Sequence, residues 1–223
     1  MKRWVEAGAD SPDAAAALAV REAPRWPAQL ARWSWLPWLA WLGVNMLQGR
    51  YARAALDNAG RERAVDEPPH ARRIHLVALA GAFTLLAPPS PGAYISGPRY
   101  SHLLAAMGLG VEMAGFAMAF WARATLGQYW TGRVALTADQ PLLRTGPYRY
   151  IRHPLYTGVL AAVLGQAFVL ARPRGFAAFA LLAFAYRRKV SYEEDALQRH
   201  FGTEYAQYSA AVPPFLPTVS RKV

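Results

Sequence analysis

Five apolar segments separated by short basic clusters dominate this 223-residue chain. They cover residues 30–47, 74–87, 100–122, 155–171 and 175–186. About 20 apolar residues cross a bilayer as a helix, and the third and fourth segments meet this requirement best. The fifth has only twelve residues, too few to cross alone, and we expect it to form a tight helical hairpin with the fourth. The pattern therefore predicts an all-α, polytopic integral membrane protein with about five transmembrane helices.

The composition excludes several classes of protein. Hydrophobic residues make up 54% of the chain and charged residues 17%, which is below the ~25% typical of soluble domains. The chain has no cysteine, so disulfides, zinc–thiolate sites and cysteine nucleophiles are excluded. Its histidines show no metal-ligand spacing, and we interpret His70 and His75 as surface residues beside a basic loop.

The net charge of +11 is distributed as expected for membrane-flanking loops. Residues 48–73 contain six arginines, residues 123–152 five, and the tail from residue 187 six lysines and arginines, whereas the two opposite connections contain one and two. The positive-inside rule places the rich loops in the cytoplasm, near anionic lipid. No basic face continues beyond single loops, so we expect no nucleic-acid binding. The composition suggests the inner membrane of a bacterium.

This charge pattern also divides the chain. We predict a tail over residues 1–29, N-terminal transmembrane helices over 30–122, and a functional core over 123–223. Because the loop 123–152 and the tail from residue 187 share the cytoplasmic face, they can build one site.

The segment LRTGPYRYIRHPLYTG, residues 143–158, is the densest cluster of chemically active side chains. Gly146-Pro147 indicates a turn, and Pro154 fits the first turn of the following helix, where its missing N–H costs nothing. Arg152 and His153 would then lie beside unpaired N–H groups at the helix N-terminus. We predict an anion-binding site at the membrane surface; the alternative is a basic anchor with tyrosines among the lipid headgroups.

The C-terminal tail offers acids on the same face. Glu193 and Glu194 follow the basic residues 187–189, and Lys189 lies four residues before Glu193. On a helix this spacing forms an ordinary solvated pair worth ~0.3–0.5 kcal/mol. Opposite the cationic turn, the acids are candidates for a ligand's amine, ribose hydroxyls or positive centre.

Glu112 lies in the middle of the third apolar segment, where a carboxylate is costly. Two interpretations stay open: a functional group, or a structural carboxyl that joins helices through Gln166. Two stripes of small residues predict close helix packing. They are Ala106, Gly110 and Ala114 in the third segment and Thr157, Ala161 and Gly165 in the fourth.

Three motifs in order, WARATLGQYWTGRV, LLRTGPYRYIRHPLYTG and EEDALQRHFGTEYAQYSAAVPPFLP, are similar to the isoprenylcysteine carboxyl methyltransferase family and its phospholipid methyltransferase relatives. The resemblance covers roughly residues 121–217, nearly half the chain. It implies an integral membrane enzyme that uses S-adenosylmethionine in a cytoplasm-facing pocket and methylates a lipidic or apolar acceptor.

The resemblance also implies site residues. The cofactor would be held by the stretch before the turn, by the turn's tyrosine, by the RHPxY element and by a tail glutamate. These positions are Arg133, Gln140, Pro141, Leu142, Leu143, Tyr148, His153, Pro154, Leu155, Tyr156 and Glu193. Lys189 stands where the family has a basic residue facing the substrate carboxylate, although the family's residue is Arg, and Gln140 stands where the family often has His.

Methyl transfer from a sulfonium is an in-line displacement, so alignment and exclusion of water are the protein's main tasks. For a carboxylate acceptor, Lys189 or Arg152 would orient the substrate. For a phenol, amine or thiol, Glu193, Glu194 or His153 would take the proton. Alternative functions are phospholipid N-methylation, O- or S-methylation of small metabolites, a non-catalytic membrane scaffold, and a membrane reductase of related fold.

Overall fold

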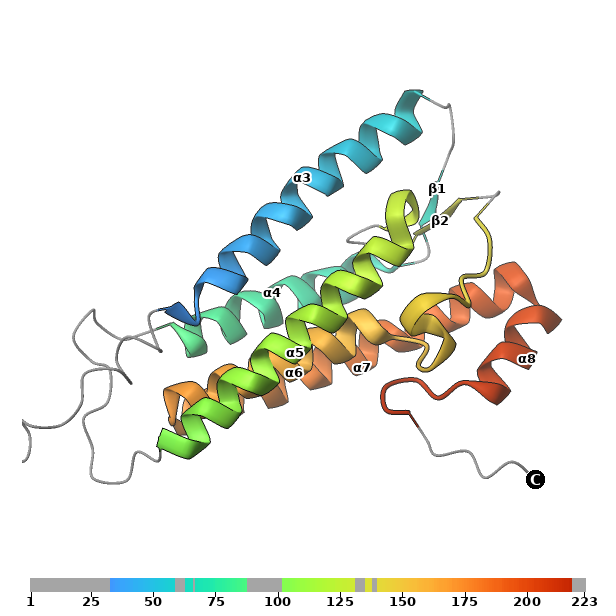
Figure 1. The fold of residues 1–223 in the computed structure, drawn as a ribbon. Coiled ribbons are helices and arrows are strands. Elements are labelled where there is room, and N and C mark those ends of the chain that lie inside the picture. Colours follow the sequence, from blue (N-terminus) through green and yellow to red (C-terminus); the bar gives the residue numbers. More distant parts are fainter. Residues whose placement is uncertain are drawn as a thin grey trace, which may run out of the picture.

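The computed structural model describes residues 33–58, 63–65, 67–87, 102–130, 135–137 and 140–217. The tail predicted over residues 1–29 lies outside these ranges. Six α-helices occur in the described part and run mostly along one another (Figure 1). They are α3 (Leu36–Asn58), α4 (Pro69–Leu86), α5 (His102–Leu126), α6 (Pro154–Leu170), α7 (Pro173–Phe201) and α8 (Thr203–Ala211). The predicted all-α fold is therefore confirmed.

The described residues also contain a short antiparallel ladder that the sequence pattern did not predict. Strand β1 (Arg63–Val65) pairs with β2 (Ala135–Thr137). Three residues per strand are too few to give an alternating pattern that can be distinguished from a loop. The ladder joins the two arginine-rich loops that charge counting placed on one face, so these loops do meet.

Helix α7 extends well beyond the apolar fifth segment at its C-terminal end. It has 29 residues, about 44 Å at 1.5 Å per residue, because the helix continues from the apolar segment through the basic residues 187–189. The connection from α6 is very short: Ala171 takes a left-handed conformation with φ of 48°, and Pro173 starts the next helix. The predicted hairpin between the fourth and fifth segments is confirmed.

Within the described residues, one helix is long and apolar enough to cross a membrane. It covers Leu103–Tyr129, 27 residues with a hydropathy of 1.7. Leu36–Leu47 and Pro154–Leu170 are shorter apolar helices. Large apolar side chains such as Leu39, Met46 and Val77 point outward and are more than 60% exposed. An apolar surface of this kind suits lipid better than water.

Helices α5 and α6 pack closely through glycines. A Cβ on Gly115 would lie 2.5 Å from the Ala162 nitrogen and the Gly158 oxygen, so only glycine fits there. The stripe predicted on α5, Ala106, Gly110 and Ala114, is wrong, because these three residues are exposed and nothing lies within 4 Å of a Cβ on Gly110. Small residues recur on both faces of α5, so spacing alone could not identify the packed face.

Glu112 is fully buried and joins three helices. The Trp38 indole nitrogen on α3 donates a hydrogen bond of 2.9 Å to its carboxylate. The Gln166 amide on α6, oriented with its nitrogen toward Glu112, donates one of 2.8 Å. The structural interpretation of Glu112 through Gln166 is therefore the one the structure supports.

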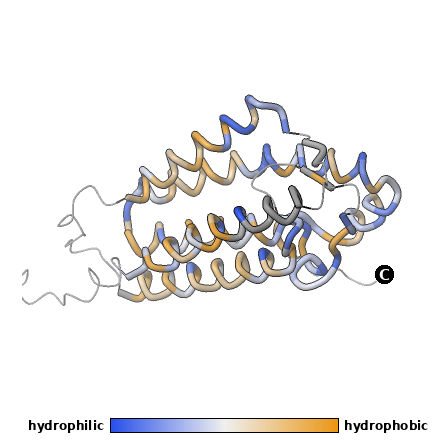
Figure 2. The backbone as a smooth tube through the Cα atoms, turned by 90° about the horizontal axis from the view of Figure 1, so that it is seen from above, coloured by the Kyte–Doolittle hydropathy of each residue, from blue (hydrophilic) through white to orange (hydrophobic). Residues whose placement is uncertain are grey.

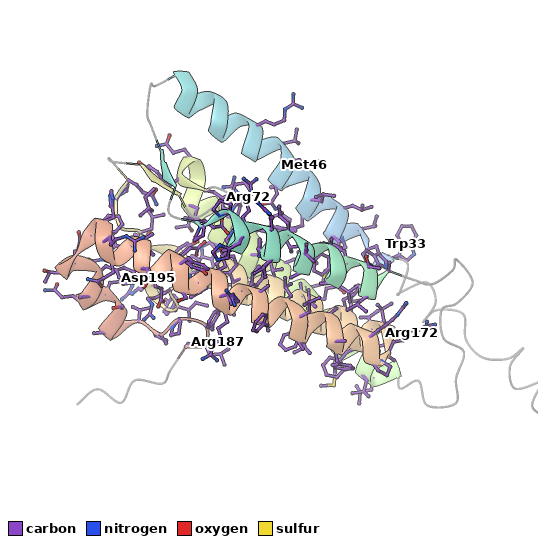
Figure 3. All side chains as sticks on the ribbon, turned by 180° about the vertical axis from the view of Figure 1, so that it is seen from behind. Trp33, Met46, Arg72, Arg172, Arg187 and Asp195 are labelled. Carbon is purple, nitrogen blue, oxygen red and sulfur yellow. The ribbon has the colours of Figure 1, made fainter. Side chains whose placement is uncertain are left out.

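The predicted site elements gather at one end of the helix bundle. The β1–β2 ladder, the start of α6, the end of α7 and α8 lie there, and the α6–α7 connection lies at the opposite end (Figure 1). Hydrophilic residues are most frequent at this end (Figure 2). Figure 3 likewise places Arg172 and Asp195 at opposite ends of α7.

Candidate functional site

The GPYR turn forms as expected, and a hydrogen bond from the C-terminal helix α8 holds it in place. Residues Gly146–Arg149 make a short 3-10 helix, η2, and Gly146 has φ of 57°, a conformation that favours glycine. Tyr148 is buried, and burial raises the pKa of its phenol well above the usual range, so the hydroxyl stays protonated. The Tyr208 hydroxyl on α8 donates a hydrogen bond of 2.7 Å to the Tyr148 carbonyl oxygen.

The chain's own C-terminal segment forms hydrogen bonds with the residues at the start of α6. The Arg152 and His153 amides donate hydrogen bonds of 2.9 Å to the carbonyl oxygens of Pro213 and Pro214. The Thr157 hydroxyl donates one of 2.9 Å to the Phe215 carbonyl. The C-terminal segment thus satisfies the backbone amides of Arg152 and His153, so these two N–H groups are not open to the anion that was predicted to bind at the start of this helix.

Arg152 is likewise engaged within the protein. Its guanidinium donates to Glu194 Oε1 from Nε at 2.9 Å and lies 2.7 Å from it through Nη2. Nη1 donates to the Ser209 and Val212 carbonyls at 2.7 and 2.6 Å. An arginine with this many internal partners holds α6, α7 and the tail together, and we assign it a positioning role in place of the substrate-orienting role expected from sequence.

Glu194 completes this arrangement. Its Oε1 lies 3.0 Å from His153 Nε2 as well as beside Arg152. Burial raises the pKa of this carboxyl, but the hydrogen bonds and charges of His153 and Arg152 outweigh burial and lower it to about 2. A carboxylate with so low a pKa is a poor proton acceptor, so Glu194 suits orientation of His153 better than base catalysis.

Both carboxylates of the cluster are partly exposed: the side chain of Glu193 is 22% exposed and that of Glu194 is 30% exposed. The Tyr156 hydroxyl donates a short hydrogen bond to Glu193, and His153 Nδ1 lies 3.6 Å from Glu193 Oε2. The structure therefore brings His153, Tyr156 and Glu193 together from segments almost 40 residues apart in sequence. Arg152 pairs with Glu194, and among the described residues no arginine forms an ion pair with Glu193.

The other residues proposed for a cofactor lie on several elements. Pro154 and Leu155 form the first turn of α6, and Pro154 is buried. Gln140, Pro141, Leu142 and Leu143 lie between β2 and η2 without regular structure, with Pro141 exposed and the other three partly buried. Arg133 lies outside the described residues.

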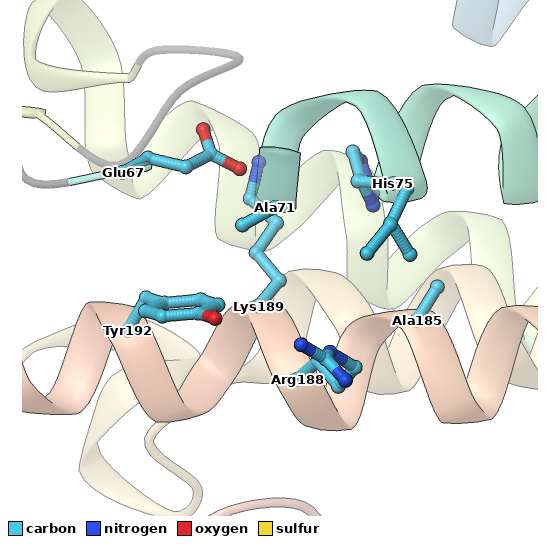
Figure 4. A pocket seen from close by; sticks show the side chains of 8 residues that line it. Glu67, Ala71, His75, Ala185, Arg188, Lys189 and Tyr192 are labelled. Atoms are coloured by element: carbon cyan, nitrogen blue, oxygen red, sulfur yellow. The ribbon is translucent and has the colours of Figure 1, made fainter. Parts of the chain in front are cut away.

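Lys189 faces a different side of α7. It is 5% exposed and lines a pocket between α4 and α7, with an empty volume of about 220 Å3 that includes its open mouth. Figure 4 shows the Glu67 carboxylate and the Lys189 amine pointing toward each other across this pocket, with His75 beside them. The interpretation of His75 as a surface residue is wrong, since it is 9% exposed, whereas His70 is exposed as expected.

An aromatic path connects this pocket with the cluster. The ring of His75 lies 5.5 Å from that of Tyr186, which lies 4.6 Å from that of Tyr156. Tyr156 in turn contacts His153, with ring centroids 6.0 Å apart. Sequence reasoning missed Glu67 and His75; a histidine just inside an apolar segment was the available signal.

Comparison with known proteins places the sequence of this chain in a family. Residues 108–199 match the model of the isoprenylcysteine carboxyl methyltransferase (ICMT) family. Protein-S-isoprenylcysteine O-methyltransferase B of Arabidopsis thaliana is 30% identical over 99 residues, 43% of this chain and 50% of that protein. A probable protein-S-isoprenylcysteine O-methyltransferase of Oryza sativa subsp. indica is 33% identical over 88 residues, 39% of this chain and 46% of that protein. The chain thus spans about half the length of these relatives.

A third relative extends the similarity toward the N-terminus. The cobalt-zinc-cadmium resistance protein CzcN of Cupriavidus metallidurans is 30% identical over 167 residues, 73% of this chain and 71% of that protein. The family match over residues 108–199 includes His153, Tyr156 and Glu193 of the cluster. The chain belongs to the isoprenylcysteine carboxyl methyltransferase family.

Proposed function

We propose that this protein is an S-adenosylmethionine-dependent integral membrane methyltransferase that acts on a lipidic or apolar acceptor. The observation that carries the proposal is the cluster of His153, Tyr156 and Glu193, which the α6–α7 hairpin and the tail hold at one end of the bundle. Membership of a family of integral membrane methyltransferases supports it.

The chemistry of the cluster fits this cofactor. S-adenosylmethionine, when bound, supplies an electrophilic methyl group on a sulfonium. Glu193 offers a partly exposed carboxylate that forms no ion pair with an arginine of the described residues, which suits the ammonium, the sulfonium or the ribose hydroxyls of the cofactor. Residues 140–143 and Tyr148, on the neighbouring loop and turn, would contribute the remaining contacts.

The chain's own residues have distinct tasks in this proposal. Glu193 binds the positive end of the cofactor, and Tyr156 fixes the orientation of that carboxylate through its hydrogen bond. Arg152 and Glu194 hold His153 and the tail in place. The C-terminal segment covers the start of α6 and excludes water from it, which strengthens the electrostatic interactions within the site.

We propose further that about five segments lie in the membrane with the cluster on the cytoplasmic side. The membrane-length helix α5, the outward apolar side chains of α3 and α4, and the gathering of hydrophilic residues at the cluster's end support this orientation. A lipidic acceptor would then enter from the bilayer between helices. The described residues hold no group of three or more His, Cys, Asp or Glu side chains arranged to hold a metal ion, so direct metal binding has no support from them.

Binding of radiolabelled S-adenosylmethionine to detergent-purified protein tests the proposal. We expect saturable binding by the wild type and at least a tenfold weaker affinity for Glu193→Gln and His153→Ala. Asp195→Asn is the matched control, because Asp195 is an exposed acid on the same helix, two residues further on. Absence of binding by the wild type would refute the methyltransferase, and unchanged affinity in both site variants would refute the site.

A further inference from the structure

A buried arginine, Arg123, lies in the last turn of α5. It belongs to the WARATLGQYWTGRV motif and to the segment that matches the family model. The residue is only 2% exposed. Arginine is rarely buried unless its charge is paired or its N–H groups are hydrogen-bonded, because removing a charge from water is costly. The partners of the Arg123 guanidinium therefore indicate what this residue does.

Two sides of the guanidinium are satisfied by residues that directly follow α5. Nη1 donates a hydrogen bond of 3.0 Å to the Gly127 carbonyl oxygen, and the central carbon lies 4.2 Å from the centroid of the Trp130 ring. The hydrogen bond and the aromatic ring together fix the position of the group. An arginine that only closes the end of a helix would make the same contacts, so these two do not indicate a ligand.

The Nε atom of Arg123 is the observation that indicates one. It is buried and has no hydrogen-bond partner among the described residues. A buried donor without a partner is destabilising, and more so when it belongs to a charged group. The Nε side of a guanidinium is also an edge on which arginine binds a carboxylate through two parallel hydrogen bonds. A carboxylate ligand would therefore satisfy the group that the protein leaves unsatisfied.

The contact between α5 and α6 places Arg123 level with the start of α6. In this antiparallel contact, a Cβ on Gly158 would lie 2.6 Å from the Ala119 nitrogen. Arg123 is four residues, about one helical turn, beyond Ala119 on the same buried face of α5. One turn before Gly158 is Pro154, the first residue of α6. Arg123 therefore lies at the end of the bundle that holds the candidate site.

Two opposite charges act on the Tyr148 hydroxyl at this end. Burial is the main cause of the raised pKa of the Tyr148 phenol; in addition, the negative charge of Glu193 raises this pKa and the positive charge of Arg123 lowers it. Coulomb interactions weaken with distance, so both charges lie near Tyr148. An α-amino acid carries an ammonium and a carboxylate on one carbon, and a neighbouring acid and cation suit it. The carboxylate of an otherwise apolar acceptor would be repelled by Glu193.

We infer that Arg123 binds the α-carboxylate of S-adenosylmethionine, while Glu193 binds the ammonium of the same amino-acid group. The inference rests on the proposed methyltransferase function. It narrows the role of Glu193, for which the ammonium, the sulfonium and the ribose hydroxyls were all candidates. Arg123 takes no part in bond making or breaking. By holding the amino-acid end of the cofactor it orients the sulfonium for in-line displacement.

Decarboxylated S-adenosylmethionine isolates the carboxylate, because it keeps the adenosine, the sulfonium and the amine. The affinity for each of the two ligands is measured by equilibrium dialysis with full-length protein in detergent. We expect the wild type to bind S-adenosylmethionine about tenfold tighter or more, and Arg123→Gln to lose this preference by weakening only S-adenosylmethionine. Arg149→Gln is the matched control, since Arg149 is an exposed arginine of the GPYR turn, and should keep the preference.

The preference is a ratio of two affinities measured on one sample, so a partly unfolded preparation does not alter it. Where Arg123→Gln does not fold, Arg123→Lys decides the question. Lysine keeps the charge but cannot form the two parallel hydrogen bonds of a guanidinium, so the preference should fall about threefold or more. A preference that Arg123→Gln or, in its place, Arg123→Lys retains in full would overturn the inference.

Two other results would also overturn it. One is equal affinity of the wild type for the two adenosyl ligands, with both bound. The other is an unchanged preference in Arg123→Gln together with loss of N-acetyl-S-farnesylcysteine binding, which would assign Arg123 to the carboxylate of an acceptor. Absence of binding of both adenosyl ligands to the wild type has a different meaning, because it refutes the proposed function and the inference with it.

Discussion

The glycine contact between α5 and α6 gives the sharpest test of the fold. In Gly115→Ala, the new Cβ would lie 2.5 Å from two backbone atoms of α6, and backbone cannot rotate away as a side chain can. The helices must separate by about 1 Å, which forfeits a quarter to a half of each local dispersion contact. Overpacking of this kind costs ~1–3 kcal/mol, and we expect the upper part of that range because both facing atoms are backbone.

Gly110→Ala is the matched control, because it makes the same chemical change on the same helix where nothing lies within 4 Å. Both variants gain ~1 kcal/mol of helix propensity, so the difference between them isolates the packing cost. At ~2–4 °C per kcal/mol for a chain of this size, the thermal unfolding midpoint of Gly115→Ala in detergent should lie roughly 4–12 °C below that of Gly110→Ala. Equal midpoints, or the reverse order, would refute the proposed helix contact.

Two further predictions concern the site. Glu194 has a folded pKa of about 2, below its ordinary value of 4.5, so its charge stabilises the fold above about pH 4.5 and this contribution is lost as the pH falls toward 2. After allowance for the partial exposure of Glu194, this charge contributes ~2 kcal/mol to the free energy of unfolding. Thermal unfolding midpoints measured between pH 6 and 3 should therefore fall more steeply for the wild type than for Glu194→Gln. Parallel plots of midpoint against pH for the two proteins would contradict this. Tyr208→Phe removes the hydrogen bond to the Tyr148 carbonyl oxygen and should lower the thermal unfolding midpoint by ~2–4 °C. The control Tyr150→Phe changes an exposed tyrosine and should leave the midpoint unchanged. Equal midpoints for the two variants would count against the Tyr208–Tyr148 hydrogen bond.

Much of the fold was predictable from local pattern. The apolar segments identified α3 to α7, although α3 runs on through the basic loop to Asn58 and α7 continues to Phe201. Proline chemistry fixed the start of α6 at Pro154, because a proline in the first turn loses no hydrogen bond. These features depend on residues within one or two helical turns of each other, and sequence spacing represents such distances directly.

The composition of the candidate site was also largely predictable, but its electrostatics were not. Arg152, His153 and Glu194 were all identified as chemically active, with Arg152 assigned to an anion. In the structure the C-terminal segment folds back against the start of α6. The Arg152 guanidinium therefore donates its hydrogen bonds to Glu194 and to the carbonyl oxygens of Ser209 and Val212. Which partner an arginine finds depends on where a segment about 60 residues away lies.

The sequence by itself determined the helical segments, the proline-started α6, the basic loops and the residue types available for binding a cofactor, because hydrophobic periodicity and turn chemistry act over short distances. The packing of the helices then set which face of α5 is buried, made Glu112 a structural residue, and brought His75 and Glu67 beside Lys189. The physical reason is the same in each case. Small residues, carboxylates and histidines can occupy either a packed or an open environment, and the choice depends on which helix lies opposite them.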